Sequence, residues 1–503
     1  MKNLALHNIL ILGLGASGLA LARWCVRYGA DVTVADTRPA PPQLAALQTS
    51  LPNVGFINAE MNAELLNIKK FDLLLKSPGL SPASISEVTN AALARGIPSG
   101  NELGLFAQAL ADLQVDTAYS PKVIGITGTN GKTTVTSLAG LLIERAGQSV
   151  AVAGNIGPTL LDTLGERLDA HAVDASVAMP EVWVLELSSF QLDGVTNFEP
   201  TVATVLNISQ DHLDWHENLP AYMAAKKNVY GSSGLMLLNR DDPLVMKALP
   251  GLVKGKAGRS HLTFGNDAPK RPGDYGIETV KGMTWLVRAV EADESLKHRR
   301  TDAPALQIQR LMPLEALRIR GRHNAANALA ALALAYSAGC ALAPMLHGLR
   351  EYRGEPHRME SVAVLDGVEY FDDSKGTNVG ATAAALTGLG SERRLVLILG
   401  GEGKGQDFTP LAGPVARHAR AVVLIGRDAP LIKAALQGAG ALLLEAASMQ
   451  EAVGLAAAQA QPGDAVLMSP ACASFDMFDN YEHRARVFCD AVRQLAVEQG
   501  AVL

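Results

Sequence analysis

The sequence predicts an α/β protein built from three successive units, each with a mostly parallel sheet. Short apolar runs alternate with helical stretches along most of the chain, and this alternation is typical of parallel sheets covered by helices. A length of 503 residues corresponds to three or four domains of ordinary size. One series of strands gives way to the next near residues 118 and 354. We therefore expect domains at 1–118, 119–354 and 355–503.

The strands are predicted from apolar runs that end in polar or glycine-rich turns. In the first unit they lie at 9–13, 31–35 and 71–75, and in the second at 122–127, 150–154, 182–187, 202–207 and 235–239. In the third they lie at 394–399, 421–425 and 465–468. Runs between residues 257 and 310 indicate hairpins in a polar insertion, to which we assign no chemistry.

Composition and charge exclude several classes of protein. Hydrophobic residues make up 48% of the chain and charged residues 19%, which excludes a disordered or a fibrous protein. The chain has 44 Lys and Arg against 50 Asp and Glu, which gives a net charge of −6. A broad electrostatic attraction to nucleic acid or to anionic lipid is therefore not expected. Local groups have to bind any anionic ligand.

Neither a secretion signal nor a membrane span is expected. The cysteines number 4, none of them in a Cys-x-x-Cys pair, which is too few for a disulfide scaffold and fits a reducing cytoplasm. His7 and Asn8 interrupt the apolar start of the chain, which then runs into a glycine-rich loop. The uncharged stretch 328–346 is mostly Ala, and we expect Gly339 and Pro344 to divide it into two short buried helices.

The first glycine-rich loop, Gly13–Gly18, follows a predicted strand and opens a helix. Free backbone amides and the helix dipole at such a site attract an anion such as a pyrophosphate. Asp36 follows the next predicted strand, where an acidic side chain can meet a ribose hydroxyl, and Arg38 adds a cation that a plain NAD site does not need. The alternative is a turn required only for close packing of helix on sheet.

A second glycine-rich loop, Gly125–Thr134, also follows a strand, and it ends in Gly131-Lys132-Thr133. Backbone amides in such a loop cradle phosphates, the lysine reaches the terminal phosphates and the threonine binds Mg²⁺. The spacing departs from the usual P-loop, because Ile126 stands where that pattern has glycine. We predict an ATP and Mg²⁺ site of a variant type.

Two polar residues follow neighbouring strands downstream of this loop. Glu186 ends the run 182–187, and His212 comes after the run 202–207. Ligands bind at the carboxyl ends of strands in α/β sheets, so Glu186 is a candidate oxygen ligand for Mg²⁺ and His212 a candidate nitrogen ligand or proton partner. The alternatives are a helix-capping or ion-paired glutamate and a histidine that is merely hydrogen-bonded.

Several further motifs have two interpretations on sequence alone. Lys226 and Lys227 are by default the solvated face of a helix, and the asparagines of the segment 323–327 are helix caps or contacts to a base or ribose. The segments 357–358, 372–378 and 400–404 offer cations, carboxylates and hydroxyls, although surface turns use the same residues. Cys472 lacks an evident histidine base, which favours packing over a nucleophile.

These motifs, in this order, resemble the Mur ligases, the ATP-dependent amide-forming enzymes of peptidoglycan precursor synthesis. The strings that carry the resemblance are Gly128–Thr134, Glu186–Gln191, Asp211-His212, Ala225-Lys226, His323–Asn327, His357-Arg358 and Asp373–Lys375. The strings Asp36–Arg38, Ser77–Gly79, Gly400–Lys404 and Ser469–Asp476 are similar to those of members that add D-glutamate. The resemblance spans nearly the whole chain.

The resemblance implies an N-terminal Rossmann-like domain, a central P-loop ATPase domain and a C-terminal Rossmann-like domain that closes over ATP and the amino acid. It implies an ATP-dependent ligase that adds D-glutamate to UDP-N-acetylmuramoyl-L-alanine through an acyl phosphate and a tetrahedral intermediate. It also implies two Mg²⁺ ions, a carbamylated Lys226 and a cytoplasmic protein. We expect a monomer with no nucleic-acid or membrane partner.

The resemblance carries site residues over one by one. UDP-substrate contacts are implied for Gly15, Ser17, Asp36, Thr37, Arg38, Ser77, Gly79, Asn155, Ser188 and Gln191. ATP contacts are implied for Gly128, Thr129, Asn130, Gly131, Lys132, Thr133, Thr134, Asn324, Asn327, Arg358 and Asp373. Metal ligands are implied at Thr133, Glu186, His212 and Lys226, and Lys132, His212 and Lys226 are the implied catalytic residues. D-glutamate contacts are implied for Lys375, Thr377, Lys404, Ser474 and Tyr481.

Three departures from the family pattern accompany these expectations. Tyr481 stands where Phe is more usual, Gly376 replaces Ala, and the insertion between 257 and 310 lengthens the central domain. Three other functions compete with the ligase: a ligase of the same family for another amino acid, a nicotinamide-dependent dehydrogenase built on the first glycine loop, and a non-catalytic nucleotide-gated binding module.

Overall fold

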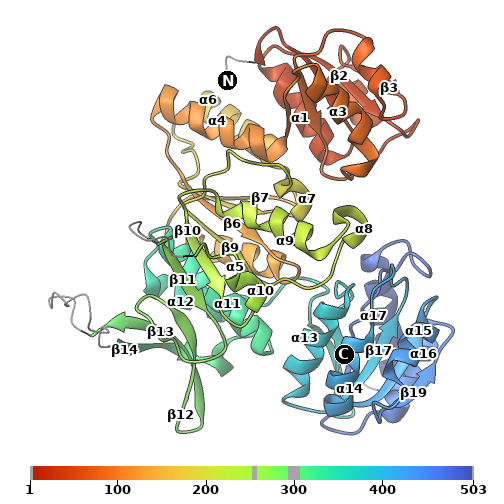
Figure 1. Ribbon diagram of the computed structural model, residues 1–503. Coiled ribbons are helices and arrows are strands. Elements are labelled where there is room, and N and C mark those ends of the chain that lie inside the picture. The colour runs from red at the N-terminus through yellow and green to blue at the C-terminus, as the bar shows by residue number, and fades with distance from the viewer. Residues whose placement is uncertain (1–3, 252–257, 293–305, 501–503) are drawn as a thin grey trace.

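The computed structural model describes residues 4–251, 258–292 and 306–500. Three sheet-and-helix bodies follow one another along the chain (Figure 1). The N-terminal body lies at the top of this view, the central body below it and the C-terminal body beside the central one. The predicted α/β class is confirmed, because three parallel or mostly parallel sheets form these bodies.

The N-terminal sheet is fully parallel, in the order β3-β2-β1-β4-β5. Its strands are β1 (Asn8–Leu12), β2 (Asp31–Asp36), β3 (Gly55–Asn58), β4 (Leu73–Lys76) and β5 (Ser99–Asn101). Its helices are α1 (Ala16–Arg27), α2 (Leu44–Ser50) and α3 (Ser86–Ala94). The central strand β1 is apolar on both faces because helices cover both of them, which explains its continuous apolar run.

Helix α4 (Glu102–Thr117) joins the N-terminal body to the central one. The Asn101 side chain caps it by accepting from the Gly104 amide at 3.0 Å, and it ends at Ala118 in the left-handed conformation. Phe106 on α4 packs edge-on against Trp183, with ring centroids 5.1 Å apart. One hydrophobic cluster therefore runs without interruption from the N-terminal sheet through α4 into the central sheet.

The central sheet is also fully parallel, in the order β11-β10-β9-β6-β8-β7. Its strands are β6 (Lys122–Thr127), β7 (Val150–Gly154), β8 (Val182–Glu186), β9 (Val202–Val205), β10 (Leu235–Asn239) and β11 (His261–Phe264). Its helices are α5 (Lys132–Arg145), α6 (Leu160–Val173), α7 (Ser189–Leu192), α8 (Leu213–His216), α9 (Leu219–Lys227), α10 (Pro243–Met246), α11 (Arg322–Ser337) and α12 (Leu342–Glu351).

The predicted hairpins of the polar insertion form a separate antiparallel sheet, β12-β13-β14, which projects from the central body (Figure 1). Its strands are β12 (Tyr275–Val280), β13 (Met283–Glu291) and β14 (Leu306–Pro313). Ala257 and the segment 293–305 lie outside the described residues.

The C-terminal sheet has the order β15-β16-β20-β17-β18-β19, with only the β15–β16 pair antiparallel. Its strands are β15 (Glu360–Leu365), β16 (Val368–Asp372), β17 (Leu395–Gly400), β18 (Ala419–Ile425), β19 (Leu442–Glu445) and β20 (Ala465–Met468). Its helices are α13 (Val379–Gly390), α14 (Ala412–His418), α15 (Ala429–Leu436), α16 (Met449–Gln459) and α17 (Tyr481–Glu498). The two faces of this sheet carry their own hydrophobic clusters.

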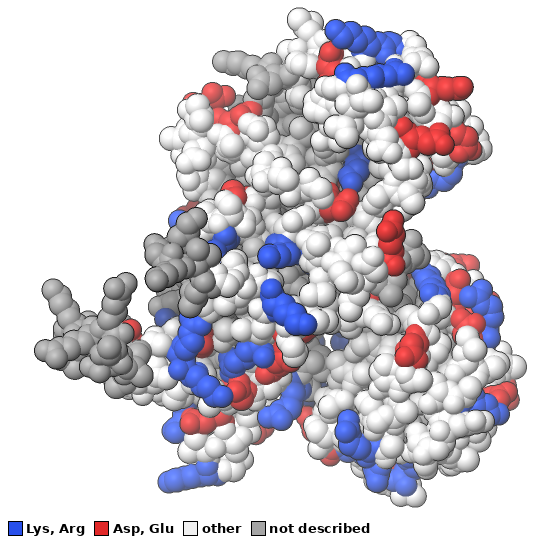
Figure 2. All heavy atoms as spheres, viewed as in Figure 1, with Lys and Arg blue, Asp and Glu red and all other residues white. Residues whose placement is uncertain are grey.

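One detail of the predicted helices is wrong. The stretch 328–346 does contain a helix break, and Gly339 makes it with a φ of +100°. Pro344 breaks nothing, because it lies in the first turn of α12, where no intrahelical amide donor is needed. In the part of the chain that the structure describes, no helix is long and apolar enough to cross a membrane. On the face shown in Figure 2, basic and acidic side chains are interspersed.

Candidate functional site

The loop between β6 and α5 is shaped by two glycines with positive φ. The angle is +154° at Gly128 and +82° at Gly131. At this φ a side chain on Gly131 would be strained, and its Cβ would lie 2.7 Å from Asn327 Oδ1, so the Asn327 side chain would have to move. Gly131 is the N-cap of α5 and offers no side-chain cap, which leaves the amides of the first turn available to an anion.

Lys132 turns its side chain back over this loop. Its Nζ donates to the carbonyl oxygens of Gly128 and Thr129, both at 2.9 Å. Burial lowers the pKa of Lys132, while Glu186 and Asp211 act in the opposite direction. An anionic ligand beside Nζ would restore the charged form, because nearby negative charge favours the ammonium.

Glu186 is the last residue of β8 and is buried, with an exposed fraction of 1%. Its Oε1 accepts from Asn155 Nδ2 at 3.0 Å. Its Oε2 is buried and has no hydrogen-bond partner within the described residues. A buried carboxylate oxygen without a donor is costly, and a cation is the group that would complete it.

Lys226 is buried on the inner face of α9, so the default interpretation of a solvated lysine is wrong for it. Its exposed fraction is 1%, whereas the neighbouring Lys227 is exposed. Its Nζ donates to Gly128 O at 2.9 Å and to Thr127 Oγ1 at 3.3 Å, and lies 4.6 Å from the centre of the Tyr222 ring. Burial, and then the charge of Lys132, lower its pKa well below the ordinary value.

His212 precedes α8 and has a φ of +53°. Its ring lies next to that of Phe190. The two rings meet edge-on with centroids 4.7 Å apart. Its Nε2 lies 3.6 Å from Asp211 Oδ2. His212 and Asp211 both line the same cavity as Glu186, so the two strand-end residues that the sequence singled out do face one space.

That space is a cavity of about 780 Å³ between the central and C-terminal bodies. From the central body it is lined by Thr129, Asn130, Gly131, Lys132, Thr133, Asn155, Ile156, Glu186, Asp211 and His212. From the connecting segment and the C-terminal body it is lined by Glu355, Pro356, His357, Arg358, Lys375, Thr377, Asn378, Tyr481 and Glu482. Cations, carboxylates and hydroxyls from both bodies thus surround one volume.

A second cavity of about 220 Å³ adjoins the other side of the phosphate loop. The expected ATP residues Asn324, Asn327, Arg358 and Asp373 line it together with Asn130, Gly131 and Thr134. Its apolar walls include Leu206, Phe264 and Ala326. Burial raises the pKa of Asp373 to about 7. Its carboxylate accepts a hydrogen bond from Ser469 Oγ at 2.7 Å, which acts in the opposite direction.

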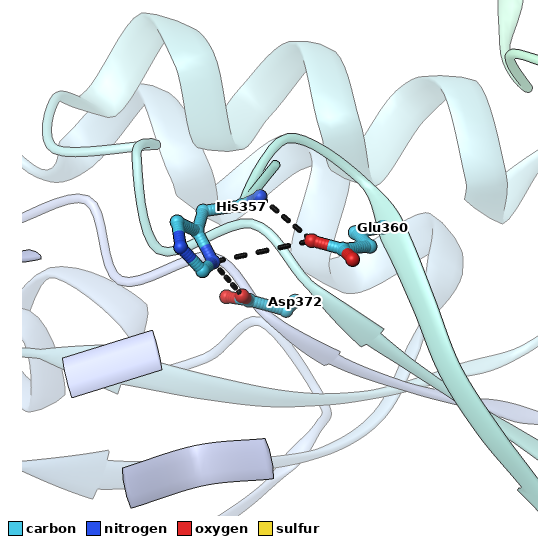
Figure 3. Close-up of side chains that lie close together, drawn as sticks. All are labelled: His357, Glu360 and Asp372. Atoms are coloured by element: carbon cyan, nitrogen blue, oxygen red, sulfur yellow. Dashed lines mark hydrogen bonds and ion pairs between the residues drawn. The ribbon is translucent and has the colours of Figure 1, made fainter. Parts of the chain in front are cut away.

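The segment that connects the two bodies is fixed to the C-terminal sheet by His357, shown in Figure 3. Its Nδ1 lies 2.7 Å from Asp372 Oδ2 and 3.9 Å from a carboxylate oxygen of Glu360, which also accepts from the His357 amide at 2.9 Å. Burial raises the pKa of Asp372, and the bond to His357 opposes this. The next residue, Arg358, crosses the gap and donates from Nη2 to Thr133 Oγ1 at 2.8 Å.

The expected D-glutamate residues fall into two groups. Lys375, Thr377 and Tyr481 line the larger cavity, with Lys375 Nζ 3.6 Å from the centre of the Tyr481 ring. Burial and the charge of Arg358 lower the pKa of Lys375 to about 8. Lys404 is exposed and lies over Phe475, 5.5 Å from the ring centre, while Ser474 is buried. A β-bridge between Glu402 and Ala473 joins the loops that carry these two residues.

In the N-terminal body, Asp36 is engaged by its own chain rather than open to solvent. Its carboxylate accepts from the amide of Leu14 at 2.8 Å, and from the amide, Nε and Nη2 of Arg38 at 2.9, 2.8 and 2.7 Å. Burial alone would raise the pKa of Asp36, but the bonds from Arg38 and Leu14 outweigh burial and lower it to about 2. Thr37 and the outer part of Arg38 remain exposed.

The other expected UDP-substrate residues lie at the carboxyl ends of β1, β4, β7 and β8. Gly15 and Ser77 are neighbours, since a Cβ on Gly15 would lie 3.9 Å from Ser77 Oγ, and Gly79 faces open space. Burial raises the pKa of Glu102, and the nearby Ser17 side chain opposes this. Asn155 is exposed, and Ser188 and Gln191 form a capping box at the start of α7. In this structure the side chains of Ser188 and Gln191 are therefore hydrogen-bonded to each other's residues.

Sequence reasoning missed several residues of these cavities. Asn239, Asp241 and Asn266 line the smaller one, and Tyr222 lies beneath Lys226. Asn266 falls in the segment 257–310, to which no chemistry was assigned. It follows β11, which pairs in parallel with β10, so the rule that ligands meet strand carboxyl ends would have found it once that pairing was known. Cys472 is buried, and burial raises the pKa of its thiol to about 12, which fits a packing role.

Three family models match the chain. They are the Mur ligase MurD-like N-terminal domain over residues 7–99, the Mur ligase middle domain over 126–335, and the Mur ligase glutamate ligase domain over 357–472. Three similar relatives are named UDP-N-acetylmuramoylalanine–D-glutamate ligase. The one from Albidiferax ferrireducens is 64% identical over 100% of this chain and 99% of its own length. That from Polaromonas sp. is 57% identical over 100% of this chain and 100% of its own length. That from Burkholderia pseudomallei is 55% identical over 98% of each chain.

Two solved structures share the fold. The MurF ligase from Thermotoga maritima in complex with ADP has a TM-score of 0.54 at 15% identity, covering 99% of this chain and 97% of that one. The UDP-N-acetylmuramate-alanine ligase MurC from the same organism has a TM-score of 0.52 at 19% identity, covering 97% and 100%.

Proposed function

The chain belongs to the Mur ligase family, and we propose that it is the ligase that joins D-glutamate to UDP-N-acetylmuramoyl-L-alanine in peptidoglycan synthesis. ATP drives the reaction, which yields the UDP-linked dipeptide precursor, ADP and phosphate. One observation carries the proposal. The chain matches D-glutamate ligases from end to end, and a single cavity brings the phosphate loop of the central body next to Lys375, Thr377 and Tyr481 of the C-terminal body.

The proposal divides the work among three domains, 1–118 for the UDP substrate, 119–354 for ATP and 355–503 for the amino acid. The separate sheets of the three bodies support this division. Only the central and C-terminal bodies line the larger cavity within the described residues, and Arg358 reaches across it. Domain closure that brings three ligands together would supply much of the rate, because it fixes the reacting groups relative to one another.

The chemistry needs no protein nucleophile. A carboxylate is a poor acyl donor at neutral pH, so the γ-phosphoryl group of ATP moves to the L-alanine carboxylate, giving ADP and an acyl phosphate. The neutral amine of D-glutamate then attacks the acyl carbon, and the tetrahedral intermediate expels phosphate as the amide forms. The amine loses its proton in this step. Lys132 would stabilise the charge on the transferring phosphoryl group, since its Nζ lies against the phosphate loop and the residue lines the larger cavity.

Nucleotide binding is assigned to residues that line one or both of the two cavities, together with Gly128 of the same phosphate loop. These are Gly128, Thr129, Asn130, Gly131, Lys132, Thr133, Thr134, Asn324, Asn327, Arg358 and Asp373. The uncapped N-terminus of α5 would hold the phosphates, and the apolar walls of the smaller cavity would hold the base.

The residues of this structure fit Mg²⁺. The buried Oε2 of Glu186 lacks a partner, and hard oxygen atoms are the donors that Mg²⁺ prefers. We assign two ions to Thr133, Glu186, His212 and Lys226. When bound, Mg²⁺ neutralises charge on the phosphoryl oxygens. Carbamylation of Lys226, in which its neutral amine adds to CO₂ and loses a proton, would turn a cation into an anionic ligand. The burial of its Nζ next to Lys132 supports this assignment, because a second cation there is unfavourable.

The two organic substrates are assigned to the remaining residues. Gly15, Ser17, Asp36, Thr37, Arg38, Ser77, Gly79, Asn155, Ser188 and Gln191 would contact the UDP substrate. Asp36 also holds the Gly13–Gly18 loop by accepting from the Leu14 amide. Lys375, Thr377, Lys404, Ser474 and Tyr481 would surround D-glutamate. We further propose a monomer in the cytoplasm, without nucleic-acid or membrane partners. The free state of all four cysteines supports a reducing compartment.

The test is phosphate release from ATP and Mg²⁺ by purified protein supplied with UDP-N-acetylmuramoyl-L-alanine. D-glutamate is compared with L-glutamate, L-alanine, L-lysine and meso-diaminopimelate. We expect release only when both the UDP substrate and D-glutamate are present, with a product heavier by one glutamyl residue. Release with another amino acid would keep the ligase mechanism but reassign the pocket around Lys375. ATP binding without release for any acceptor would leave a binding module instead.

A further inference from the structure

Helix α13 of the C-terminal body lies against α11 of the central body (Figure 1). It directly follows the segment that carries Lys375 and Thr377, two of the expected D-glutamate residues. Asn378 is the N-cap of α13 and is buried, with an exposed fraction of 6%. The position of α13 therefore determines where this segment lies relative to the phosphate loop.

Asn378 and Asn130 of the phosphate loop form a reciprocal pair of amide hydrogen bonds, which we call the latch. Asn378 Nδ2 donates to Asn130 Oδ1 at 3.1 Å, and Asn130 Nδ2 donates to Asn378 Oδ1 at 3.3 Å. Asn378 Nδ2 also donates to Asp211 Oδ2 at 3.4 Å. The start of α13 is thus bonded to two residues of the central body.

The orientations of both amides in the latch are fixed by other groups. Asn378 Oδ1 accepts from the Ala381 amide at 2.8 Å, and its Nδ2 faces the Asp211 carboxylate, which only accepts. Turning this amide over would lose both bonds. The Asn130 amide donates to Asn207 Oδ1 at 2.8 Å, and the Asn130 carbonyl oxygen accepts from Asn207 Nδ2 at 3.0 Å. Each member of the latch is therefore held in place by its own body.

Two glycines allow α13 to approach the central body closely. Gly380 and Gly388 lie about two helical turns apart, and so on the same face of α13. A Cβ built on Gly380 would lie 2.6 Å from Ser209 Oγ. A Cβ built on Gly388 would lie 2.8 Å from His323 Nδ1. The helix thus contacts the central body at both of its ends, and a larger side chain at either position would push the two bodies apart.

We propose that Asn378 is a positioning residue that latches the C-terminal body to the phosphate loop, through Asn130, in the closed arrangement in which the ligase reaction takes place. The inference rests on the proposed function, of which domain closure is a part, and adds the contact that holds the closed arrangement. In this arrangement Lys375 and Thr377 line the same cavity as the phosphate loop. Both amides of the latch are neutral, so it does not compete with metal or phosphate for charge.

The alternative is a purely structural role for Asn378 as the cap of α13. A capping oxygen alone would fulfil that role, and serine supplies one about as well as asparagine does. Serine has a single polar side-chain atom, which capping occupies, and it lacks the NH₂ group that bonds to Asn130 and Asp211. Asn378→Ser therefore keeps the cap and removes the latch.

The experiment measures closure by small-angle X-ray scattering while the full chain is titrated with a non-hydrolysable ATP analogue in the presence of Mg²⁺. Asn378→Ser should need about tenfold more analogue than the unaltered protein to reach its most compact form, because loss of the two amide bonds lowers the population of the closed arrangement. The value of kcat/KM for D-glutamate should fall by a similar factor, and the dissociation constant of the UDP substrate should not change. Asn218→Ser is the matched control, since Asn218 caps α9 from an exposed position.

Gly388→Ala is an independent test of the same contact. The added methyl group enters the contact with His323, while alanine forms helices better than glycine does. Closure should therefore need more analogue, although the amides of α13 should exchange no faster with solvent. A purely structural role would change both measurements in the same direction. Gly454→Ala, inside α16, is the control, because a Cβ there has no neighbour within 4 Å.

The inference and the proposed function can fail separately. Asn378→Ser that becomes compact at the same analogue concentration as the unaltered protein, with kcat/KM for D-glutamate unchanged, would overturn the inference and leave the ligase intact. A shifted titration in a protein without ligase turnover would support the latch and contradict the proposed function.

Discussion

Two glycine loops in this protein are built in the same way, but they differ in whether their charged groups have partners within the chain. Each follows the central strand of a parallel sheet and opens a helix, α1 in the N-terminal body and α5 in the central one. In the N-terminal loop the nearby carboxylate of Asp36 is fully bonded by Leu14 and Arg38. In the central loop Glu186 has an oxygen without a partner among the described residues. The half-buried Lys132 and the buried Lys226 both have lowered pKa values.

The difference separates recognition from chemistry. A loop whose charges are satisfied by its own chain is already in its final form and can bind a substrate without rearranging. In a loop with unpaired charges, the arrangement of the side chains becomes energetically favourable only when ligands bring the opposite charges. Formation of the complete central site therefore depends on the binding of ATP and metal. Both loops are rich in glycine, so the glycines do not distinguish them. What distinguishes them is whether the nearby carboxylate, Asp36 or Glu186, has its hydrogen-bond partners within the chain.

The largest effect is expected from Lys132→Ala, which removes the central loop's cation. Turnover should fall by about 10³-fold, because the charge that develops on the phosphoryl group loses its closest protein partner. Phosphate release is the measurement, and Lys227→Ala, on an exposed lysine near the same site, is the control. Turnover within tenfold of the unaltered protein would show that the lysine is not part of the chemistry.

Glu186→Gln sharpens the comparison by neutralising the incomplete carboxylate while keeping the acceptor for Asn155. The Mg²⁺ concentration for half-maximal activity should rise by about 10- to 100-fold. Thermal stability without ligands should stay the same or rise, because an unpaired buried charge is removed. A marked loss of stability with unchanged metal dependence would mean that Glu186 is structural.

Asp36→Asn tests the satisfied carboxylate. We expect the N-terminal body to lose about 2 kcal/mol of stability at pH 7, read from hydrogen exchange of the β1 amides. The pKa of Asp36 is lowered in the folded protein to about 2, so its contribution is present above the ordinary value near 3.8 and is lost as pH falls toward 2. The difference between variant and parent should therefore shrink below pH 4. Asp31→Asn, on an exposed strand residue, is the control.

The smallest effect concerns Lys375, which faces the central loop from the C-terminal body. Because its pKa is lowered to about 8, it loses its charge above that pH, and KM for D-glutamate should rise by about tenfold for each further unit. Lys375→Arg should remove this rise, since guanidinium stays charged. The amine of glutamate titrates equally in both proteins and cancels in the ratio. Parallel pH profiles would contradict the assignment.

The fold was largely predictable because buried parallel strands appear as continuous apolar runs. The strands that escaped prediction are short and lie at sheet edges, such as β3 and β19, whose half-exposed residues lack any such run. The edge hairpin β15–β16 escaped for a similar reason, since its first strand is mostly exposed or half-buried.

The site was predictable where its residues follow a strand or sit in a glycine loop, as Glu186 and Lys132 do. The burial of Lys226 was not, because a helix places lysine on either face and only the packing of α9 against the phosphate loop decides which. Asn266 escaped because β11 is followed by a long polar insertion that hides its place in the sheet. The engagement of Asp36 by the Leu14 amide depends on tertiary contact alone.

The most direct test of the two-loop account is paired calorimetry on Lys132→Ala and Thr37→Val, each titrated with the UDP substrate and with Mg²⁺ and ATP. Thr37 is exposed beside the satisfied loop, and valine keeps its shape while removing the hydroxyl. We predict that Lys132→Ala loses ATP and keeps the UDP substrate, whereas Thr37→Val weakens the UDP substrate by about tenfold and keeps ATP. Loss of both ligands in either variant would contradict the proposal that the N-terminal loop binds the UDP substrate and the central loop binds ATP independently of each other.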